Sequence, residues 1–191
     1  MSVLGELQPN KVFKYFEEIC SIPHGSRNLQ QISDYLVDFA KAHELKYRQD
    51  EDLNVIIWKD GSKGYEASEP VILQGHMDMV AVKEADCDKD MEKEGLDLEI
   101  NGDYISAKGT SLGGDDGIAV AYTLAVLDDE EMAHPPIEAI FTVNEEIGML
   151  GAATIDVSDL KGRLFMNMDS EDEGVFTVSC AGGASEIGRA S

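Results

Sequence analysis

The sequence predicts an α/β protein with a mixed, mostly parallel sheet sandwiched by helices. Three observations favour this fold class. Short apolar runs are typical of buried strands, two amphipathic stretches precede most of them, and one strongly apolar helix lies between two of the runs. With 191 residues, of which 43% are hydrophobic, the chain is long enough to bury a substantial core.

Two helices are expected near the N-terminus. In the first, apolar residues recur at helical spacing from Val12 to Cys20, with Asn10 as the cap and Pro23 as a stop. The second begins near Ser26, and its apolar residues recur at intervals of three and four, which gives a single apolar stripe.

Extended segments follow, and several are apolar enough to be buried on both faces of a sheet. Asn101-Gly102 suits the tight turn of a β-hairpin between residues 96–100 and 104–107. Residues 118–127 are apolar almost all round, which predicts a buried helix. The other predicted strands are residues 46–49, 54–58, 71–73, 137–143, 164–168 and 175–178.

The apolar run Val71–Val80 ends in a histidine and a carboxylate. Gly75 is expected to let the backbone leave the sheet. Because strand side chains repeat every second residue, His76 and Asp78 can point the same way, and such a carboxylate fixes the tautomer of a metal-bound histidine. For this pair alone, a hydrogen-bonded histidine at a strand end is the alternative.

Further acids lie at the ends of other predicted elements. Asp115 and Asp116 precede the buried helix, whose dipole favours ionised carboxylates, and Glu145 with Glu146 and then Asp169 follow two strands. In α/β folds such strand ends meet at one edge, where ligands bind. An imidazole with several carboxylates suits Zn²⁺, Mn²⁺ or Co²⁺, and two ions are expected if one carboxylate bridges them. One of the adjacent glutamates would then bind metal and the other accept a proton from bound water.

Composition excludes several kinds of partner and location. The 15 basic and 38 acidic side chains give a net charge of −23, which disfavours nucleic acid and anionic membranes. Three widely spaced cysteines (Cys20, Cys87 and Cys180) predict a reducing compartment without a disulfide framework. We find no signal peptide and no apolar run near the roughly 18 residues that span a bilayer, so a soluble cytoplasmic protein is expected.

The other histidines and the methionines beside His76 are interpreted as structural. His24 is expected in a loop or the core, and His43 and His134 at the surface. Met77 and Met79 are expected to pack against neighbouring side chains.

Four motifs follow one another along the chain: His76-Met77-Asp78, Gly109–Asp115 (GTSLGGD), Asn144–Gly148 (NEEIG) and Asn167–Glu171 (NMDSE). In this order they resemble the motifs of the cocatalytic zinc exopeptidases, which include peptidase T, carboxypeptidase G and the carnosinases. The resemblance runs from Val12 to Gly183 and is strongest to the bacterial aminoacyl-histidine dipeptidases, also called peptidase D or Xaa-His dipeptidases.

The resemblance implies which residues bind metal. His76 and Asp169 would bind one zinc ion, Glu146 would bind the other, and Asp115 would bridge the two. The family often has Asp-Asp-Lys after the glycines, whereas this chain has a glycine after Asp116. The role of Asp116 is therefore left open.

The resemblance also implies the reaction. Asp78 would orient His76, and Glu145 would be the general base for attack of water on the peptide carbonyl. The expected activity is the hydrolysis of small dipeptides of the Xaa-His type, such as β-alanyl-histidine, at a dinuclear zinc site.

Family members are considerably longer than this chain. They carry an inserted lid domain that often forms homodimers and a returning segment that supplies a final histidine ligand. Residues 1–183 are therefore expected to be the N-terminal part of the catalytic domain and residues 184–191 the start of the lid segment, with little or no hydrolysis by the chain alone. The alternatives are a noncatalytic metal-binding or interaction domain and a related exopeptidase such as a tripeptidase.

Overall fold

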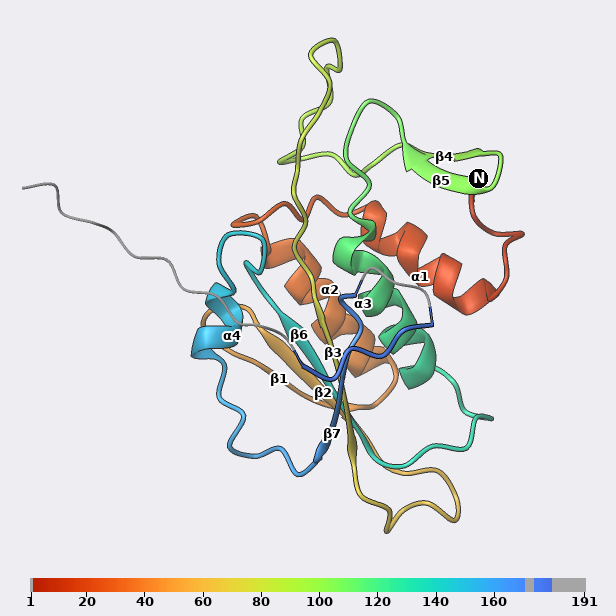
Figure 1. The fold of residues 1–191 in the computed structure, drawn as a ribbon, viewed down its shortest axis with the longest axis vertical. Helices are drawn as coiled ribbons and strands as arrows, with labels where there is room; N and C mark the ends of the chain where they lie inside the picture. The colour runs from red at the N-terminus through yellow and green to blue at the C-terminus, as the bar shows by residue number, and fades with distance from the viewer. Residues whose placement is uncertain (1, 171–173, 180–191) are drawn as a thin grey trace, which may run out of the picture.

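The computed structural model describes residues 2–170 and 174–179 (Figure 1). The expected features at Glu171, Cys180 and residues 184–191 lie outside this part of the chain. The helices are α1 (Asn10–Cys20), α2 (Gln30–Ala42), α3 (Gly114–Leu127) and α4 (Leu150–Thr154). The strands are β1 (Lys46–Gln49), β2 (Val55–Lys59), β3 (Val71–His76), β4 (Leu98–Asn101), β5 (Tyr104–Ala107), β6 (Ile137–Thr142) and β7 (Leu164–Asn167).

The main sheet has the strand order β1-β2-β6-β3-β7. β3 pairs in parallel with both β6 and β7, while β2 runs antiparallel to its neighbours, so four of the five strands point the same way. The parallel register sets His76 opposite Thr142 and Gln74 opposite Asn167. The carboxyl ends of β3, β6 and β7 therefore meet at one edge, and the mixed α/β fold is confirmed.

The main hydrophobic core lies between one face of the sheet and helices α1, α2 and α3 (Figure 1). Ile57, Ala139 and Phe141 are fully buried on this face. A Cβ atom on Gly75 would lie only 2.9 Å from the Cβ of Ala119 in α3. Helix α3 therefore packs so closely on β3 that only glycine fits at this position.

The buried acid Glu138, in the central strand β6, fixes the segment that leads into β7. Both of its carboxylate oxygens accept the backbone N–H of Lys161 at 3.0 Å, and one also accepts that of Gly162 at 2.9 Å. A Cβ on Gly162 would lie 2.8 Å from the side chain of Ile72, so this segment also packs tightly on β3. The two contacts together set the position from which β7 starts.

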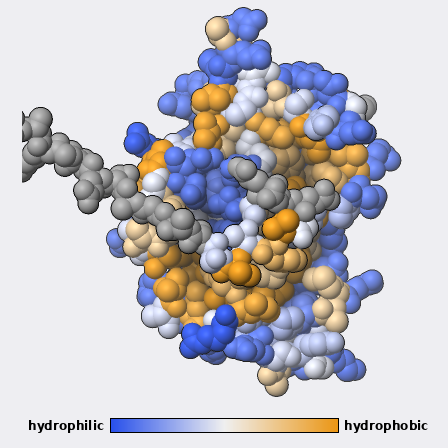
Figure 2. All heavy atoms as spheres, in the orientation of Figure 1, coloured by the Kyte–Doolittle hydropathy of each residue, from blue (hydrophilic) through white to orange (hydrophobic). Residues whose placement is uncertain are grey.

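Strand β7 is the exposed edge of the sheet. Among the described residues it pairs only with β3. Its side chains Leu164, Phe165 and Met166 are 58%, 55% and 38% exposed, and Figure 2 shows hydrophobic residues gathered over this part of the surface.

Several predicted elements are confirmed. The β4–β5 hairpin pairs Asn101 with Tyr104, and its turn uses Gly102 at φ +64°, which glycine adopts without strain. Met77 and Met79 are buried and pack as expected.

Cys20 and Cys87 are free thiols in the structure. No helix in the described ranges is long and apolar enough to cross a membrane.

Two helix boundaries differ from the prediction. Pro9, not Asn10, occupies the cap position of α1, because the Asn10 side chain donates instead to the carbonyl of Gly5 at 2.8 Å. Helix α2 begins at Gln30 rather than near Ser26. Arg27 has φ +73°, outside the helical region, so the segment before α2 forms a loop.

Three other local predictions are wrong. β3 continues through Gly75, which pairs with Phe141, and ends only at His76. His134 is buried, and its Nδ1 lies 2.8 Å from the carbonyl oxygen of Pro135. Residues 175–178 have no strand pairing.

Candidate metal centre

His76, at the carboxyl end of β3, is the centre of the site. Its side chain is only 1% exposed. Nδ1 lies 2.9 Å from the backbone oxygen of Asp78 and 3.5 Å from its carboxylate. Because a carbonyl oxygen can only accept, Nδ1 carries a proton, and Nε2 faces Oδ1 of Asp115 at 3.0 Å and Oε2 of Glu145 at 3.9 Å.

Surrounding acids change the basicity of His76. Burial alone would lower its pKa, but the hydrogen bond to Asp78 and the charges of Asp116 and Asp78 raise the pKa to about 9. Metal-free His76 is therefore largely protonated at neutral pH. A divalent cation at Nε2 would replace that proton.

Asp78 lies behind the histidine and is completely buried. Its carboxylate accepts the Ser26 hydroxyl at 2.7 Å and the backbone N–H groups of Glu145 and Glu146 at 2.9 and 3.4 Å. Burial would raise the pKa of Asp78, but the bonds from His76, Glu145 and Ser26 hold it below its usual value. Asp78 is therefore an anion bound by the protein itself.

Asp115 and Asp116 lie at the start of α3, where their backbone angles are not helical. The Asp115 side chain is 70% exposed, whereas Asp116 is buried and its Oδ2 accepts the backbone N–H of His76 at 3.1 Å. Burial, reinforced by the charges of Asp169 and Asp115, raises the pKa of Asp116 to about 7 despite the opposing effect of His76. The expected stabilisation of ionised Asp116 by the helix dipole is therefore outweighed.

Glu145 and Glu146 lie on the turn after β6. Burial raises the pKa of both, and nearby acids, Asp169 for Glu145 and Asp115 for Glu146, raise them further. Repulsion of this kind is relieved when a cation binds between the carboxylates.

Two groups of side chains could each hold a metal ion, and both include His76. One group adds Asp115 and Glu146, and the other adds Asp116 and Asp169. In each group one ligand atom per residue lies within 4.8 Å of the others. Nitrogen and carboxylate oxygen ligands fit Zn²⁺, so the residues present suit the expected metal.

The structure thus brings the predicted residues His76, Asp115, Glu146 and Asp169 to one edge of the sheet, with Glu145 and Asp78 beside them. It also brings Asp116 to this site, a residue whose role the sequence left open.

This chain is similar to known proteins in both sequence and structure. The Escherichia coli cytosol non-specific dipeptidase is 40% identical over 183 residues, which cover 96% of this chain and 38% of that protein. The crystal structure of aminoacylhistidine dipeptidase from Vibrio alginolyticus matches with a TM-score of 0.87 and 40% identity, covering 90% of this chain and 35% of that one. The resemblance to this dipeptidase family is confirmed.

More distant matches share the fold. A Staphylococcus aureus tripeptidase has a TM-score of 0.71 at 23% identity and covers 88% of this chain. No protein-family model matches the chain. The chain spans well under half the length of the dipeptidases that it matches.

In this dipeptidase-like fold, Ser26 and Asn144 make contacts next to the site that were not predicted from the sequence. Ser26 bonds to Asp78, and the Asn144 side chain accepts the backbone N–H of Arg27 at 2.8 Å. Both bonds join residues far apart in the sequence, so local patterns contain no signal for them. The order of the family motifs locates Asn144 but not its contact.

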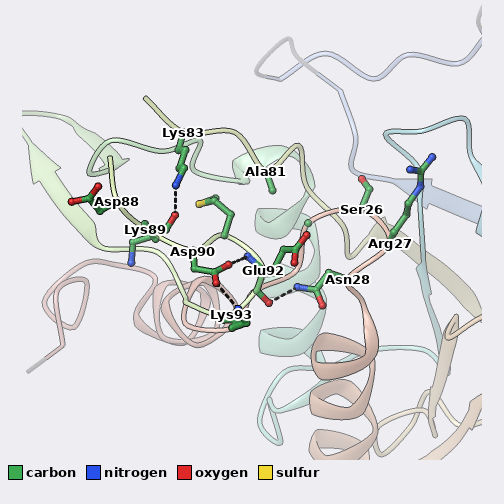
Figure 3. A pocket seen from close by; sticks show the side chains of 12 residues that line it. Ser26, Arg27, Asn28, Ala81, Lys83, Asp88, Lys89, Asp90, Glu92 and Lys93 are labelled. Carbon is green, nitrogen blue, oxygen red and sulfur yellow. Dashed lines mark hydrogen bonds and ion pairs between the residues drawn. The ribbon is translucent and has the colours of Figure 1, made fainter. Parts of the chain in front are cut away.

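The loop that contains Ser26 also lines a hollow of about 950 Å³ (Figure 3). Much of its charged lining is bonded internally. Lys93 pairs with Asp90 at 2.8 Å, and Lys83 donates to the carbonyl of Lys89 at 2.7 Å. Ser26 lines this hollow and also contacts Asp78, so the loop borders both the hollow and the metal centre.

Proposed function

We propose that the protein containing this chain is a zinc-dependent peptidase that hydrolyses small peptides. The observation that carries this proposal is the convergence of the two possible metal-binding groups on His76. The dipeptidase names of relatives that are 40% identical support the same reaction class.

In this proposal His76 and Asp169 would hold one zinc ion, Glu146 would hold the other, and Asp115 would bridge them. Bound zinc would polarise the peptide carbonyl and lower the pKa of water. Asp116 is also close enough to His76 and Asp169 to be a ligand. Measuring how readily a chelator removes zinc from the Asp115→Asn variant and from the Asp116→Asn variant would show which aspartate is needed to retain both ions.

Glu145 is the proposed general base. Its carboxylate lies 3.9 Å from Nε2 of His76, and its raised pKa brings it closer to neutrality, where proton exchange with water is efficient. Glu145 would accept a proton from the attacking water and return it to the departing amine. Asp78 would hold both His76 and the backbone of the Glu145 turn in position.

The proposal extends to the whole protein. Relatives named cytosol non-specific dipeptidase and aminoacylhistidine dipeptidase support a cytoplasmic dipeptidase with Xaa-His peptides among its substrates. We further propose that residues 1–183 are the N-terminal part of its catalytic domain. A lid segment beginning near residue 184 would complete the site, include the final histidine ligand and form a homodimer.

The test is a Glu145→Gln variant of the intact protein. Hydrolysis of β-alanyl-histidine should fall by about 10²–10⁴-fold, the range for loss of a general base, while the zinc content is unchanged. Glu51→Gln, at an exposed glutamate, is the matched control. A panel of dipeptides with and without a C-terminal histidine defines the substrate class.

A noncatalytic metal-binding domain makes a different prediction. The wild-type protein would then bind zinc but hydrolyse no member of the panel, and Glu145→Gln would change nothing measurable. That result would contradict the peptidase proposal and leave the metal centre intact.

A further inference from the structure

We propose that Ser26 is a positioning residue of the metal centre that acts through Asp78. This inference rests on the zinc site of the proposed function. It concerns a residue from the loop before α2, remote in sequence from the acids and the histidine that form the site.

The loop that contains Ser26 is fastened to the segment after β3. The backbone N–H of Met79 donates to the carbonyl of His24 at 3.2 Å, and the N–H of Ser26 donates back to the carbonyl of Met79 at 3.2 Å. A Cβ on Gly25 would lie 2.6 Å from the Cβ of Ala81, so only glycine allows the approach. The backbone therefore holds Ser26 directly beside Asp78.

The Ser26 hydroxyl makes the shortest hydrogen bond to the Asp78 side chain, 2.7 Å to Oδ2. The other contact of Oδ2 is the N–H of Glu146 at 3.4 Å, whereas Oδ1 lies 2.9 Å from the N–H of Glu145 and 3.5 Å from Nδ1 of His76. Without Ser26, one oxygen of this buried carboxylate would keep only a long hydrogen bond.

Asp78 links two segments that carry metal-binding candidates. Its backbone oxygen and carboxylate contact His76, while its carboxylate also accepts both N–H groups of the Glu145–Glu146 turn. A rotation of this one carboxylate would therefore displace candidates on both segments. Ser26 opposes such a rotation, because its hydroxyl is fixed by the loop.

The same loop has a second bond to the turn. The Arg27 N–H donates to the Asn144 side chain at 2.8 Å, and Asn144 has φ +53°, a left-handed conformation that asparagine tolerates better than most residues. Residues 26 and 27 thus hold the turn from two directions, through Asp78 and through Asn144.

The experiment compares Ser26→Ala and Ser26→Thr in the intact protein by titrating Zn²⁺ against a fluorescent chelator. Loss of a residue that supports a metal ligand typically weakens binding by about 10–100-fold, which is the expectation for Ser26→Ala. Threonine keeps the hydroxyl, so Ser26→Thr should bind zinc within about threefold of the wild type.

Ser21→Ala is the matched control. Its hydroxyl donates to the backbone carbonyl of Glu18 at 2.6 Å at the end of α1, away from the metal centre. This variant should bind zinc like the wild type. Thermal unfolding of the metal-free proteins separates positioning from general stability, because Ser26→Ala should lose much more zinc-induced stabilisation than metal-free stability.

Unchanged zinc affinity in Ser26→Ala would overturn the inference. Equal weakening in Ser26→Ala and Ser26→Thr would also overturn it, because the hydroxyl would then be irrelevant. A wild-type protein that binds zinc without hydrolysing peptides would refute the proposed function alone, and the effect of Ser26→Ala on zinc affinity would still be measurable.

Discussion

The unusual basicity of His76 gives a prediction that can be measured without substrate. In the metal-free protein its pKa is raised to about 9, whereas burial lowers the pKa of His24 below its usual value. At pH 7 an ordinary histidine is about 24% protonated, but one with a pKa of about 9 is about 99% protonated. The pKa of His76 should therefore lie above the ordinary histidine value and that of His24 below it.

The shift has a consequence for stability. One pKa unit corresponds to about 1.4 kcal/mol, so the rise from the ordinary value of 6.5 to about 9 is worth at most about 3.5 kcal/mol. Because the folded-state pKa lies above the unfolded value, this contribution is complete below pH 6.5 and is lost as the pH rises through about 9. Zinc binding has the opposite dependence, since Zn²⁺ must displace the proton. Loss of the His76 proton alone should strengthen zinc binding about ninefold from pH 7 to 8, whereas an ordinary histidine would strengthen it only about 1.3-fold.

The assay is an NMR titration of isotope-labelled histidine side chains in the metal-free protein, with zinc affinity measured at pH 7 and 8. A His76→Gln variant identifies the His76 signal, and the His24 signal is an internal control in the same spectra. The reasoning is refuted if the signal lost in His76→Gln titrates at or below pH 7.

Three further predictions concern the supports of the site and its metal. Glu138→Gln should lower the free energy of unfolding by about 1.5–3 kcal/mol, because the buried N–H of Gly162 or the partly buried N–H of Lys161 would face an amide group. Urea unfolding measures this, and exposed Glu51→Gln should change the free energy of unfolding by less than about 0.5 kcal/mol. Gly75→Ala should cost about 1–3 kcal/mol and weaken zinc binding, since its Cβ would lie 2.9 Å from both Ala119 and the Asp116 carboxylate; an equally stable variant would contradict the close packing of α3. When free zinc is held at about 100 times its dissociation constant, adding a chelator should remove about 2.7 kcal/mol of stability, which calorimetry measures. Adding Mg²⁺ should not restore that stability.

Much of the fold follows from local sequence patterns. Strands β2, β3 and β6 each contain a short run rich in apolar residues, and residues 118–127 of α3 are apolar almost all round, which is typical of a buried helix. The strand order could not be predicted in the same way. Insertion of β6 between β2 and β3, and the reversed direction of β2, depend on which edges pair after the chain collapses.

Some site residues likewise follow from local sequence patterns, whereas others depend on tertiary packing. His76 and Asp169 were predicted because they follow apolar runs, and parallel strands bring such ends together. Asp115 was predicted because it precedes the buried helix within a family motif. The burial of Asp116 depends instead on how closely α3 packs on Gly75. The contact of Ser26 spans 52 residues, and the apolar spacing of α2 suggested a helix where the chain forms a loop.

The open edge at β7 affects how this chain behaves during handling. Within residues 2–170 and 174–179 no strand pairs with the outer side of β7, so the backbone groups beside Leu164, Phe165 and Met166 form a template on which another extended peptide can add, which favours aggregation at high concentration. Lys161 and Arg163 precede the strand and Asp169 follows it, and charges in these positions discourage such growth. Neutralising Lys161 and Arg163 should therefore promote turbidity well before it alters the folded core.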